Sequence, residues 1–264
     1  MDIKEALSRE DSHINRHPWE IARLKIIHEI YGHVLQMLSK RHVPLVTIDV
    51  GCGDLFVTRS LAAKHADHKF IGVDHAINSQ VDKKIRDAVV FPNMDVYSSL
   101  DHIKHHDRFV DIVLLCDVLE HIEDDVNFLS HLAANIILKP DALFIITVPA
   151  FQNLFYSHDK FLDHFRRYNH IQLLKMANQA RLNVVDYGYF FLSLLLPRFF
   201  QVIFERLFSI QLNKDHTGVS KWKGHHAIDS KMVRLLLLDY YFSKCMRKWG
   251  VHFWGLSCFM ICQK

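Results

Sequence analysis

The sequence predicts an α/β fold with a doubly wound parallel sheet, and three observations support this prediction. Short, nearly unbroken runs of Val, Ile and Leu alternate with segments whose apolar residues recur at helical spacing. A turn with two glycines, Gly51 and Gly53, follows the first of these runs, and an aspartate, Asp74, ends the second. Strands that are apolar throughout are buried on both faces, which is typical of parallel sheets covered by helices on both sides.

The first expected element is a helix over residues 19–39, with apolar side chains on one face and Pro18 where a first helical turn tolerates proline. Further helices are expected at 55–66, 125–138 and 170–180. The expected strands cover 45–50, 69–74, 88–91, 109–115, 142–148, 181–190 and 252–263. Right-handed crossovers should connect the parallel strands.

A long insertion separates the last two expected strands and contains two amphipathic helices and a polar loop at 213–230. We therefore divide the chain into four segments. They are an N-terminal helical lid at 1–44, an α/β core at 45–191, a helical substrate cap at 192–250, and the final strand of the core at 251–264.

Composition narrows the class of protein. The chain has 264 residues and a formal net charge of +3, and its basic residues alternate with acidic ones, which argues against a nucleic-acid partner. The five cysteines form no CxxC pair, and the first residues contain no apolar signal segment. No stretch of the sequence stays uncharged and apolar over the roughly 18 residues that a membrane-spanning helix needs. These features predict a cytoplasmic protein with reduced thiols.

Histidine is abundant, with 20 residues, but most are scattered along the chain. His102, His105 and His106, and again His225 and His226, lie in polar segments without cysteine or carboxylate partners at metal-ligand spacing. We therefore expect solvated histidines and no metal site.

The stretch IDVGCGDLF, residues 48–56, carries the clearest ligand-binding signal. Glycine allows a sharp turn and a close approach of the ligand, and the N-terminus of the next helix offers free N–H groups. Asp74 could accept both hydroxyls of a ribose. Asp95 follows the third expected strand, where its carboxylate could bind an adenine amino group.

Phe56 stands where a dinucleotide-binding fingerprint has its third glycine, and it would crowd a pyrophosphate. A ligand with adenosine but no pyrophosphate fits better, and S-adenosylmethionine is such a ligand. Asp49 and Asp54 are placed near its positively charged methionine end. The alternative for Asp49 is that its carboxylate only caps the turn.

These motifs, together with CDVLEHI at 116–122, resemble class I S-adenosylmethionine-dependent methyltransferases over roughly residues 45–191 and the final strand. The resemblance implies a Rossmann-like sheet of seven mostly parallel strands, with the last strand antiparallel between the fifth and sixth. It also implies a set of residues around the cofactor S-adenosylmethionine: Asp49, Gly51, Cys52, Gly53, Asp54, Asp74, His75, Asp95, Val96, Asp117 and Val118.

Two further motifs are similar to a bacterial subgroup (type 11/12) of these enzymes. They are HPWE at 17–20 and SxHD…HxRRY at 157–168. In that subgroup a glycine often precedes the second histidine, whereas Asp163 stands here and leaves the local turn geometry open.

The second motif brings candidates for acceptor chemistry to the edge of the sheet. A hydroxyl acceptor benefits from a base, and His158 is the first candidate, with Asp159 as its orienting partner. His164 is the second candidate and His121 a further one. The residues expected to bind the substrate are Trp19, Arg166, Arg167 and Tyr168. The alternative is structural: the arginines pair with Asp159 and Asp163 and cap the next helix, while Glu120 and His121 satisfy helix-end groups.

The apolar segment 188–210 has a narrow polar stripe at Arg198, Gln201, Glu205 and Ser209. Such a helix is buried, or lies on a membrane, or surrounds an apolar substrate. Nearby lysines suit anionic lipid headgroups or an acyl carrier protein, although an ordinary solvated loop explains them almost as well: Lys214, Lys221, Lys223 and Lys231. Peripheral contact with the inner membrane and a carrier-tethered acceptor both stay open.

The predicted function is methyl transfer from S-adenosylmethionine to a small hydrophobic or aromatic acceptor, either lipid-like or tethered to a carrier. One alternative is a nicotinamide-dependent oxidoreductase, which Phe56 and the absence of a recognisable Tyr-x-x-x-Lys pair disfavour. Another is a catalytically inactive regulatory subunit that binds S-adenosylmethionine.

Overall fold

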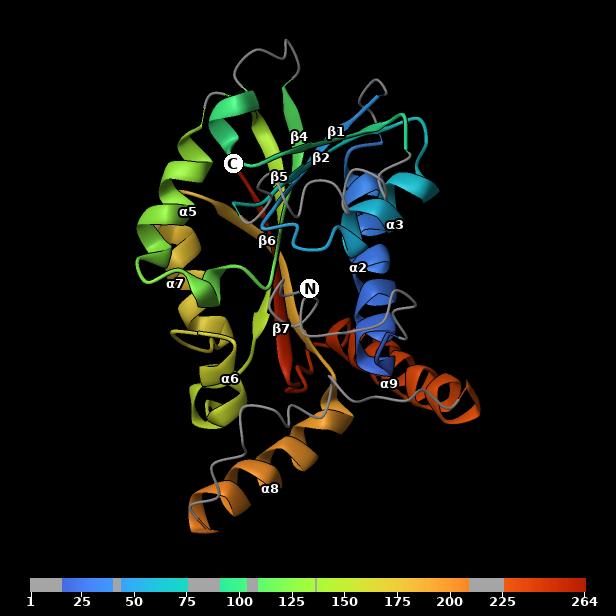
Figure 1. Ribbon diagram of the computed structural model, residues 1–264, viewed down its shortest axis with the longest axis vertical. Helices are drawn as coiled ribbons and strands as arrows, with labels where there is room; N and C mark the ends of the chain where they lie inside the picture. Colours follow the sequence, from blue (N-terminus) through green and yellow to red (C-terminus); the bar gives the residue numbers. More distant parts are fainter. Residues whose placement is uncertain (1–15, 40–43, 76–90, 104–108, 136, 209–225) are drawn as a thin grey trace.

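Seven strands form a single sheet at the centre of the protein, and helices lie on both of its faces (Figure 1). This computed structural model describes residues 16–39, 44–75, 91–103, 109–135, 137–208 and 226–264. The strand order is β3-β2-β1-β4-β5-β7-β6. The predicted doubly wound α/β fold is confirmed, and so is the place of the last strand between the fifth and sixth.

Five strands of the sheet run parallel to one another. They are β1 (Val46–Val50), β2 (Lys69–Val73), β3 (Met94–Tyr97), β4 (Val110–Cys116) and β5 (Leu138–Pro149). Every residue of β1 and β4 is buried, as expected of strands covered on both faces. The chain returns to the sheet on opposite sides of β1, which lies between β2 and β4, and a ligand crevice forms at such a switch point outside the carboxyl ends of the strands.

The other two strands are antiparallel to their neighbours. They are β6 (Asn183–Phe190) and β7 (Ser257–Gln263), and β7 pairs antiparallel with both β5 and β6. The last strand was expected at 252–263, but residues 252–256 precede β7 and belong to no strand.

Two groups of helices pack on opposite faces of the sheet (Figure 1). Ile26, Leu61 and Leu236 belong to the apolar cluster on one face, and Leu129 and Leu173 belong to the cluster on the other. The first group is α2 (Pro18–Met37), α3 (Phe56–Lys64) and α9 (His226–Arg247), and the second is α5 (Asp125–Ala134) and α7 (His170–Gln179). Short helical segments are η1 (Leu100–Ile103), η2 (Leu119–His121), η3 (Gln152–Leu154) and α6 (Ser157–Phe161).

The third strand differs from its prediction. It was expected at 88–91, of which 88–90 lie outside the described residues, whereas β3 begins at Met94. Residues 91–94 form a turn, in which the Met94 amide donates to the Phe91 carbonyl at 3.1 Å. The side-chain amide of Asn93 donates to carbonyls at the end of α3 and beyond it, those of Ala62, His65 and His68. Asp95 consequently lies inside the strand and not after it.

The boundaries of two other elements differ from those that the sequence predicted. The helix expected at 125–138 ends at Ala134, because the Asn135 side chain accepts a hydrogen bond from the Ile137 amide and β5 starts at Leu138. Of the polar loop expected at 213–230, residues 213–225 lie outside the described residues, and 226–230 form the first turn of α9.

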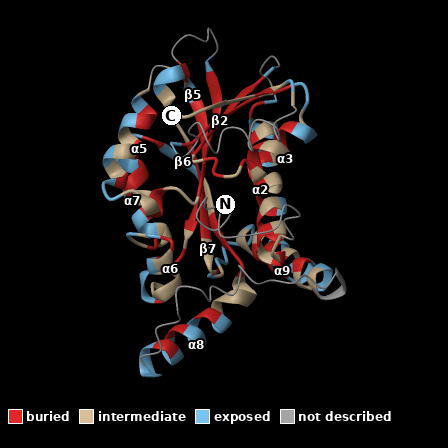
Figure 2. Cartoon of the chain, in the orientation of Figure 1, coloured by how far each residue is buried: buried red, intermediate tan, exposed pale blue. Residues whose placement is uncertain are grey.

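α8 (Leu192–Phe208) has a buried and an exposed side (Figure 2), and its polarity is reversed relative to an ordinary surface helix, with charged residues buried and apolar residues exposed. Arg198 and Glu205 are buried, and Ser209 lies outside the described residues. The exposed apolar side chains are Leu196, Phe199, Phe200, Ile203, Phe204, Leu207 and Phe208. Burial of the apolar face, one of three alternatives for this segment, is therefore wrong. No helix in the described ranges has both the length and the apolar composition needed to cross a bilayer.

Candidate active site

The glycine turn joins the carboxyl ends of β1 and β2. Gly51 and Gly53 have φ angles of 75° and 54°, in the left-handed region that favours glycine. The Gly51 amide donates to the Val73 carbonyl at 2.7 Å, and the Gly53 amide donates to the Asp74 carboxylate at 2.9 Å. A Cβ on Gly51 would lie 2.6 Å from a methyl carbon of Val118. Glycine is therefore required here both by the backbone angles and by the approach of the segment after β4.

Asp49 lies next to this turn with an unsatisfied oxygen. Its carboxylate is buried, and one oxygen accepts a hydrogen bond from the Thr58 hydroxyl at 2.5 Å. The other oxygen is buried and has no hydrogen-bond partner among the described residues. Burial raises the pKa of Asp49 to about 6. An unpaired carboxylate oxygen beside the turn fits a cofactor that carries an ammonium group and a sulfonium.

Asp74 and Asp95 occupy different positions relative to the ligand edge. Asp74 follows β2 directly and is nearly buried, whereas the side chain of His75 is almost fully exposed. Asp95 lies two residues before the end of β3, and its carboxylate pairs at 2.9 Å with Lys69 at the start of β2. Tyr97, which the sequence pattern did not single out, ends β3 and accepts the Asp74 amide at 3.1 Å. The contact of Asp95 with adenine, which the family resemblance also implies, stays a prediction.

The remaining predicted cofactor residues surround the turn. Cys52 is buried, and a Cβ on Gly72 would lie 3.1 Å from its sulfur. Val96 lies within β3 and pairs with Gly72 in the sheet. Asp54 forms an ion pair with Arg16, whose guanidinium also lies 4.0 Å above the ring centroid of Phe56. The side chain in place of the third glycine thus packs against a cation from the start of the described chain.

The HPWE motif starts α2. His17 caps the helix: its ring nitrogen accepts the Trp19 amide at 3.3 Å, and its own amide donates to Glu20 at 2.8 Å, so the pair forms a capping box. Trp19 lines a small hollow together with Phe56 and Val57 of α3. The motif places the start of α2 against the start of α3.

α2 also supplies a buried cation to the segment after β4. Arg23 pairs with Asp117 at 2.5 Å and donates to the Thr147 hydroxyl at 3.3 Å. Asp117 has a φ of 56° and accepts a further hydrogen bond from Thr147 at 3.2 Å. The sequence pattern missed Arg23 and Thr147; the available signal was a charged residue within the apolar face of the expected helix.

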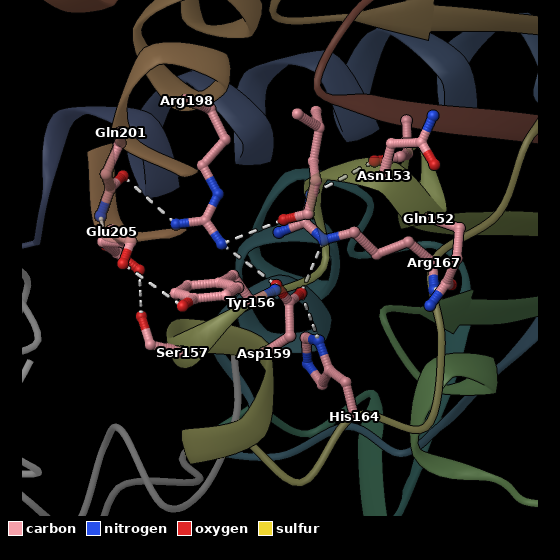
Figure 3. Close-up of polar contacts among 12 residues, drawn as sticks. Gln152, Asn153, Tyr156, Ser157, Asp159, His164, Arg167, Arg198, Gln201 and Glu205 are labelled. Atoms are coloured by element: carbon pink, nitrogen blue, oxygen red, sulfur yellow. Dashed lines mark hydrogen bonds and ion pairs between the residues drawn. The ribbon is translucent and has the colours of Figure 1, made fainter. Parts of the chain in front are cut away.

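Asp159 is the centre of a buried network at the end of β5 (Figure 3). It accepts hydrogen bonds from Arg167 Nε at 2.7 Å, Arg198 at 3.1 Å, and the Tyr156 amide at 3.0 Å. His164 Nδ1 lies 3.2 Å from it. Burial alone would raise its pKa, but the hydrogen bond from His164 and the charge of Arg167 hold the pKa of Asp159 well below its usual range.

This network changes the pairing expected among the catalytic candidates. Asp159 was predicted to orient His158, but its histidine partner is His164. Burial and the charge of Arg198 lower the pKa of His158 to about 4, so its imidazole is neutral and weakly basic at neutral pH. Asp163, which replaces the subgroup glycine, has a φ of 56° and adopts the turn geometry that glycine would favour.

The predicted substrate-binding side chains of the RRY segment are engaged within the protein. Arg167 is buried and donates to Asp159 and to the Ala150 carbonyl. Arg166 pairs with Asp125 at 3.2 Å. The Tyr168 hydroxyl is shared between the Asp125 carboxylate, at 2.7 Å, and the Leu119 carbonyl, at 2.9 Å. The structural alternative accounts for Arg167, which pairs with Asp159.

His121 and His164 come together although they are far apart in sequence. Their ring centroids are 4.6 Å apart in an edge-to-face arrangement. Glu120, next to His121 in the chain, is fully buried, and the Phe165 amide donates to its backbone carbonyl at 2.7 Å. One possible ligand atom of each of the three residues lies within 4.8 Å of the other two. The structure therefore gathers Glu120, His121 and His164 at one point beside Asp117.

The sheet order, the glycine turn and the acidic end of β2 define a class I methyltransferase that uses S-adenosylmethionine. The model of the methyltransferase domain family matches residues 23–187, which is more than half of the chain. The chain belongs to this family, and its cofactor is S-adenosylmethionine. When bound, this cofactor supplies an activated methyl group on a sulfonium. No curated protein sequence matches the chain.

Solved structures of the same fold include proteins with different activities. A putative sarcosine dimethylglycine methyltransferase from Galdieria sulphuraria is similar over 89% of this chain and 84% of its own, with a TM-score of 0.53 and 17% identity. Coclaurine N-methyltransferase, bound to N-methylheliamine and SAH, has a TM-score of 0.52 and 13% identity over 93% of this chain and 72% of its own. The [4+2]-cyclase SpnF has a TM-score of 0.50 and 15% identity over 89% and 80%. Identities this low show the fold alone, so the acceptor must be argued from this chain's residues.

Replacing Asp74 tests the cofactor site. We expect Asp74→Ala to weaken S-adenosylmethionine binding by at least tenfold, since it removes charge-assisted hydrogen bonds worth about 1.5–3 kcal/mol. Asp95→Asn should change the affinity less than about threefold, because the Asp95 carboxylate pairs with Lys69. Calorimetric titration of both variants with S-adenosylmethionine measures the difference, and equal losses would contradict the placement of Asp95.

Asp49 should make stability depend on pH. Its pKa is about 6 in the folded protein, against about 3.9 in an unfolded chain, so the folded state holds the proton more tightly. This contribution to stability is complete below about pH 4 and is lost as the pH rises through 6. Relative to Asp49→Asn, the unfolding free energy of the unmodified protein should fall by up to about 3 kcal/mol over that window, as measured by urea denaturation. If the unfolding free energies of the two proteins changed with pH in the same way, the raised pKa of Asp49 would be refuted.

Proposed function

We propose that the protein transfers a methyl group from S-adenosylmethionine to a hydroxyl of a small, lipid-like acceptor that it meets at a membrane surface. The observation that carries this proposal is the reversed polarity of α8, whose apolar side chains are exposed while its polar stripe is held against the candidate active site. Methyl transfer itself is shown by family membership, and the nature of the acceptor is the proposed part.

The attachment of α8 supports an apolar acceptor. Arg198 of α8 donates to Asp159, and the Ser157 hydroxyl donates to Glu205 at 2.6 Å. The Tyr156 hydroxyl reaches the Glu205 carbonyl at 3.4 Å. These contacts hold the polar stripe of α8 on α6 and turn its apolar face outward. An apolar molecule leaving a bilayer would meet that face first and Asp159's neighbours next.

A membrane is favoured over an acyl carrier protein as the source of the acceptor. Seven exposed apolar side chains on one helix form a surface suited to burial among lipid acyl chains. Of the four lysines that suit anionic lipid headgroups or an acidic carrier, Lys231 is exposed in the first turns of α9, and the other three lie outside the described residues: Lys214, Lys221 and Lys223. The proposed location is therefore peripheral, on the cytoplasmic side of a membrane.

The acceptor hydroxyl is proposed to be activated at the cluster of Glu120, His121 and His164. The orienting carboxylate Asp159 contacts His164, and the low pKa of His158 makes that residue the poorer base. Positioning of the hydroxyl in line with the methyl group supplies much of the rate acceleration, since the displacement needs no covalent intermediate with the protein. Arg166 and Arg167 are occupied within the protein, so an anionic group on the acceptor is not required.

Charged substitutions on α8 test the membrane contact. We expect Phe200→Glu/Leu207→Glu to reduce co-sedimentation with phosphatidylcholine–phosphatidylglycerol vesicles by tenfold or more, because each buried Phe or Leu is worth about 1.5–3 kcal/mol. Ile171→Glu, an exposed apolar residue on α7, is the matched control and should sediment like the unmodified protein. Equal sedimentation of all three would mean that α8 does not bind vesicles, and binding to an acyl carrier protein instead would favour the other source.

Labelled cofactor tests the acceptor class. With S-adenosylmethionine carrying a tritiated methyl group and a total lipid extract, we expect label in the organic phase. His164→Ala should lower this transfer about 100-fold or more while leaving cofactor affinity unchanged, and His158→Ala should cause a smaller loss. Label found only in water-soluble products would contradict a lipid-like acceptor, and equal rates for the two variants would contradict the role of His164.

A further inference from the structure

Glu120 is a buried carboxylate that lacks a partner. Its side chain is fully buried, and neither of its side-chain oxygens has a hydrogen-bond partner among the described residues. Buried polar groups in proteins are nearly always satisfied, so an orphan carboxylate indicates that a cation or a donor completes the site.

Two imidazoles adjoin this carboxylate. The possible ligand atoms of Glu120, His121 and His164 lie within 4.8 Å of one another. Two ligands at about 2.1 Å from a shared ion are at most about 4.2 Å apart, so small side-chain rotations bring all three atoms to bonding distance. The hydrogen bond from the Phe165 amide to the Glu120 carbonyl, 2.7 Å long, keeps the two segments side by side.

Asp159 prepares His164 for this role. Its carboxylate is paired with Arg167 and Arg198 and accepts hydrogen bonds from its neighbours. The proton of a neutral His164 ring therefore resides on Nδ1, which lies 3.2 Å from Asp159, and Nε2 keeps its lone pair for a ligand. A carboxylate on the far nitrogen is the usual arrangement around metal-binding histidines.

We propose that Glu120, His121 and His164 bind one divalent transition-metal cation. Two imidazoles and a carboxylate suit Zn²⁺ and also the other first-row divalent ions. Three protein ligands leave at least one coordination position open, as in catalytic metal sites. The sequence pointed away from a metal because it offered no ligands at close spacing, whereas these three ligands meet only in the folded chain.

The role of the cation rests on the proposed function. An acceptor hydroxyl in the open position becomes more acidic, so in the metal-loaded site His164 activates the hydroxyl as a ligand of the cation and not as the base. The hydroxyl proton passes to water, its oxygen forms the new bond to the methyl carbon, and the carbon–sulfur bond breaks with its electron pair remaining on sulfur. The charge of the cation also compensates Glu120.

Arg23 offers the competing explanation of the orphan carboxylate. Its Nη atoms contact Asp117 and Thr147, and its buried Nε has no hydrogen-bond partner among the described residues. A rearranged Arg23 could satisfy Glu120 without a metal. The ligand set of two histidines favours the cation, because Arg23 leaves the gathering of His121 and His164 unexplained.

Direct titration tests the site without cofactor or acceptor. The full chain, stripped of metal with a chelator, is titrated with ZnCl₂ by calorimetry and with CoCl₂ by visible absorption. We expect one ion per chain. Glu120→Gln, His121→Ala and His164→Ala should each weaken zinc binding by about 100-fold or more, beyond the 10–100-fold typical of outer-shell changes. His131→Ala, an exposed histidine on α5, is the matched control and should bind zinc normally.

The absence of stoichiometric binding, or an equal loss in His131→Ala, would overturn the proposal. So would a Glu120→Gln variant that binds zinc as tightly as the unmodified protein, which is the result that pairing of Glu120 with Arg23 predicts. If Glu120→Gln fails to fold, the two histidine variants decide. These titrations fail or succeed independently of methyl transfer, whereas full methyl transfer in the presence of chelator would overturn the role of the cation alone.

Discussion

The buried charge of Asp159 determines how the acceptor side of the protein is arranged. Burying a carboxylate costs several kcal/mol unless charged partners and hydrogen bonds compensate it, and removing one partner leaves the rest uncompensated. Here Arg167, Arg198, His164 and the Tyr156 amide converge on it. The position of α8 on α6 and the orientation of His164 follow from this one requirement. The second arginine also adds positive charge, which helps to lower the pKa of His158.

The cofactor side depends on a different constraint, the approach of three chain segments at the ends of β1, β2 and β4. Gly51 leaves room for Val118, and Gly53 binds Asp74, so the turn is fitted to the protein as much as to a ligand. α2 closes the arrangement through Arg23, whose ion pair with Asp117 anchors the segment after β4. That segment continues into Glu120 and His121, which links the two sides of the site.

Sequence periodicity predicted the sheet because β1, β2, β4 and the second half of β5 are almost fully buried and mostly apolar. It failed at the third strand, since a short apolar run at 88–91 resembles a strand more than residues 94–97 do, although the latter pair with β2. The contact of Asp95 with adenine stays a prediction. Pairing between strands decides such boundaries, and pairing is not a local property.

The sequence by itself determined the fold class, the glycine turn and the acidic residue after β2, because these depend on local backbone geometry and on the period of apolar residues. Only the tertiary structure decided which charged and titratable groups meet. His164 rather than His158 contacts Asp159, and the polar side of α8 faces inward, because a buried carboxylate selects partners by distance in space. The gathering of Glu120, His121 and His164 has the same origin: residues remote in sequence become neighbours when the loop after β5 folds over the end of β4.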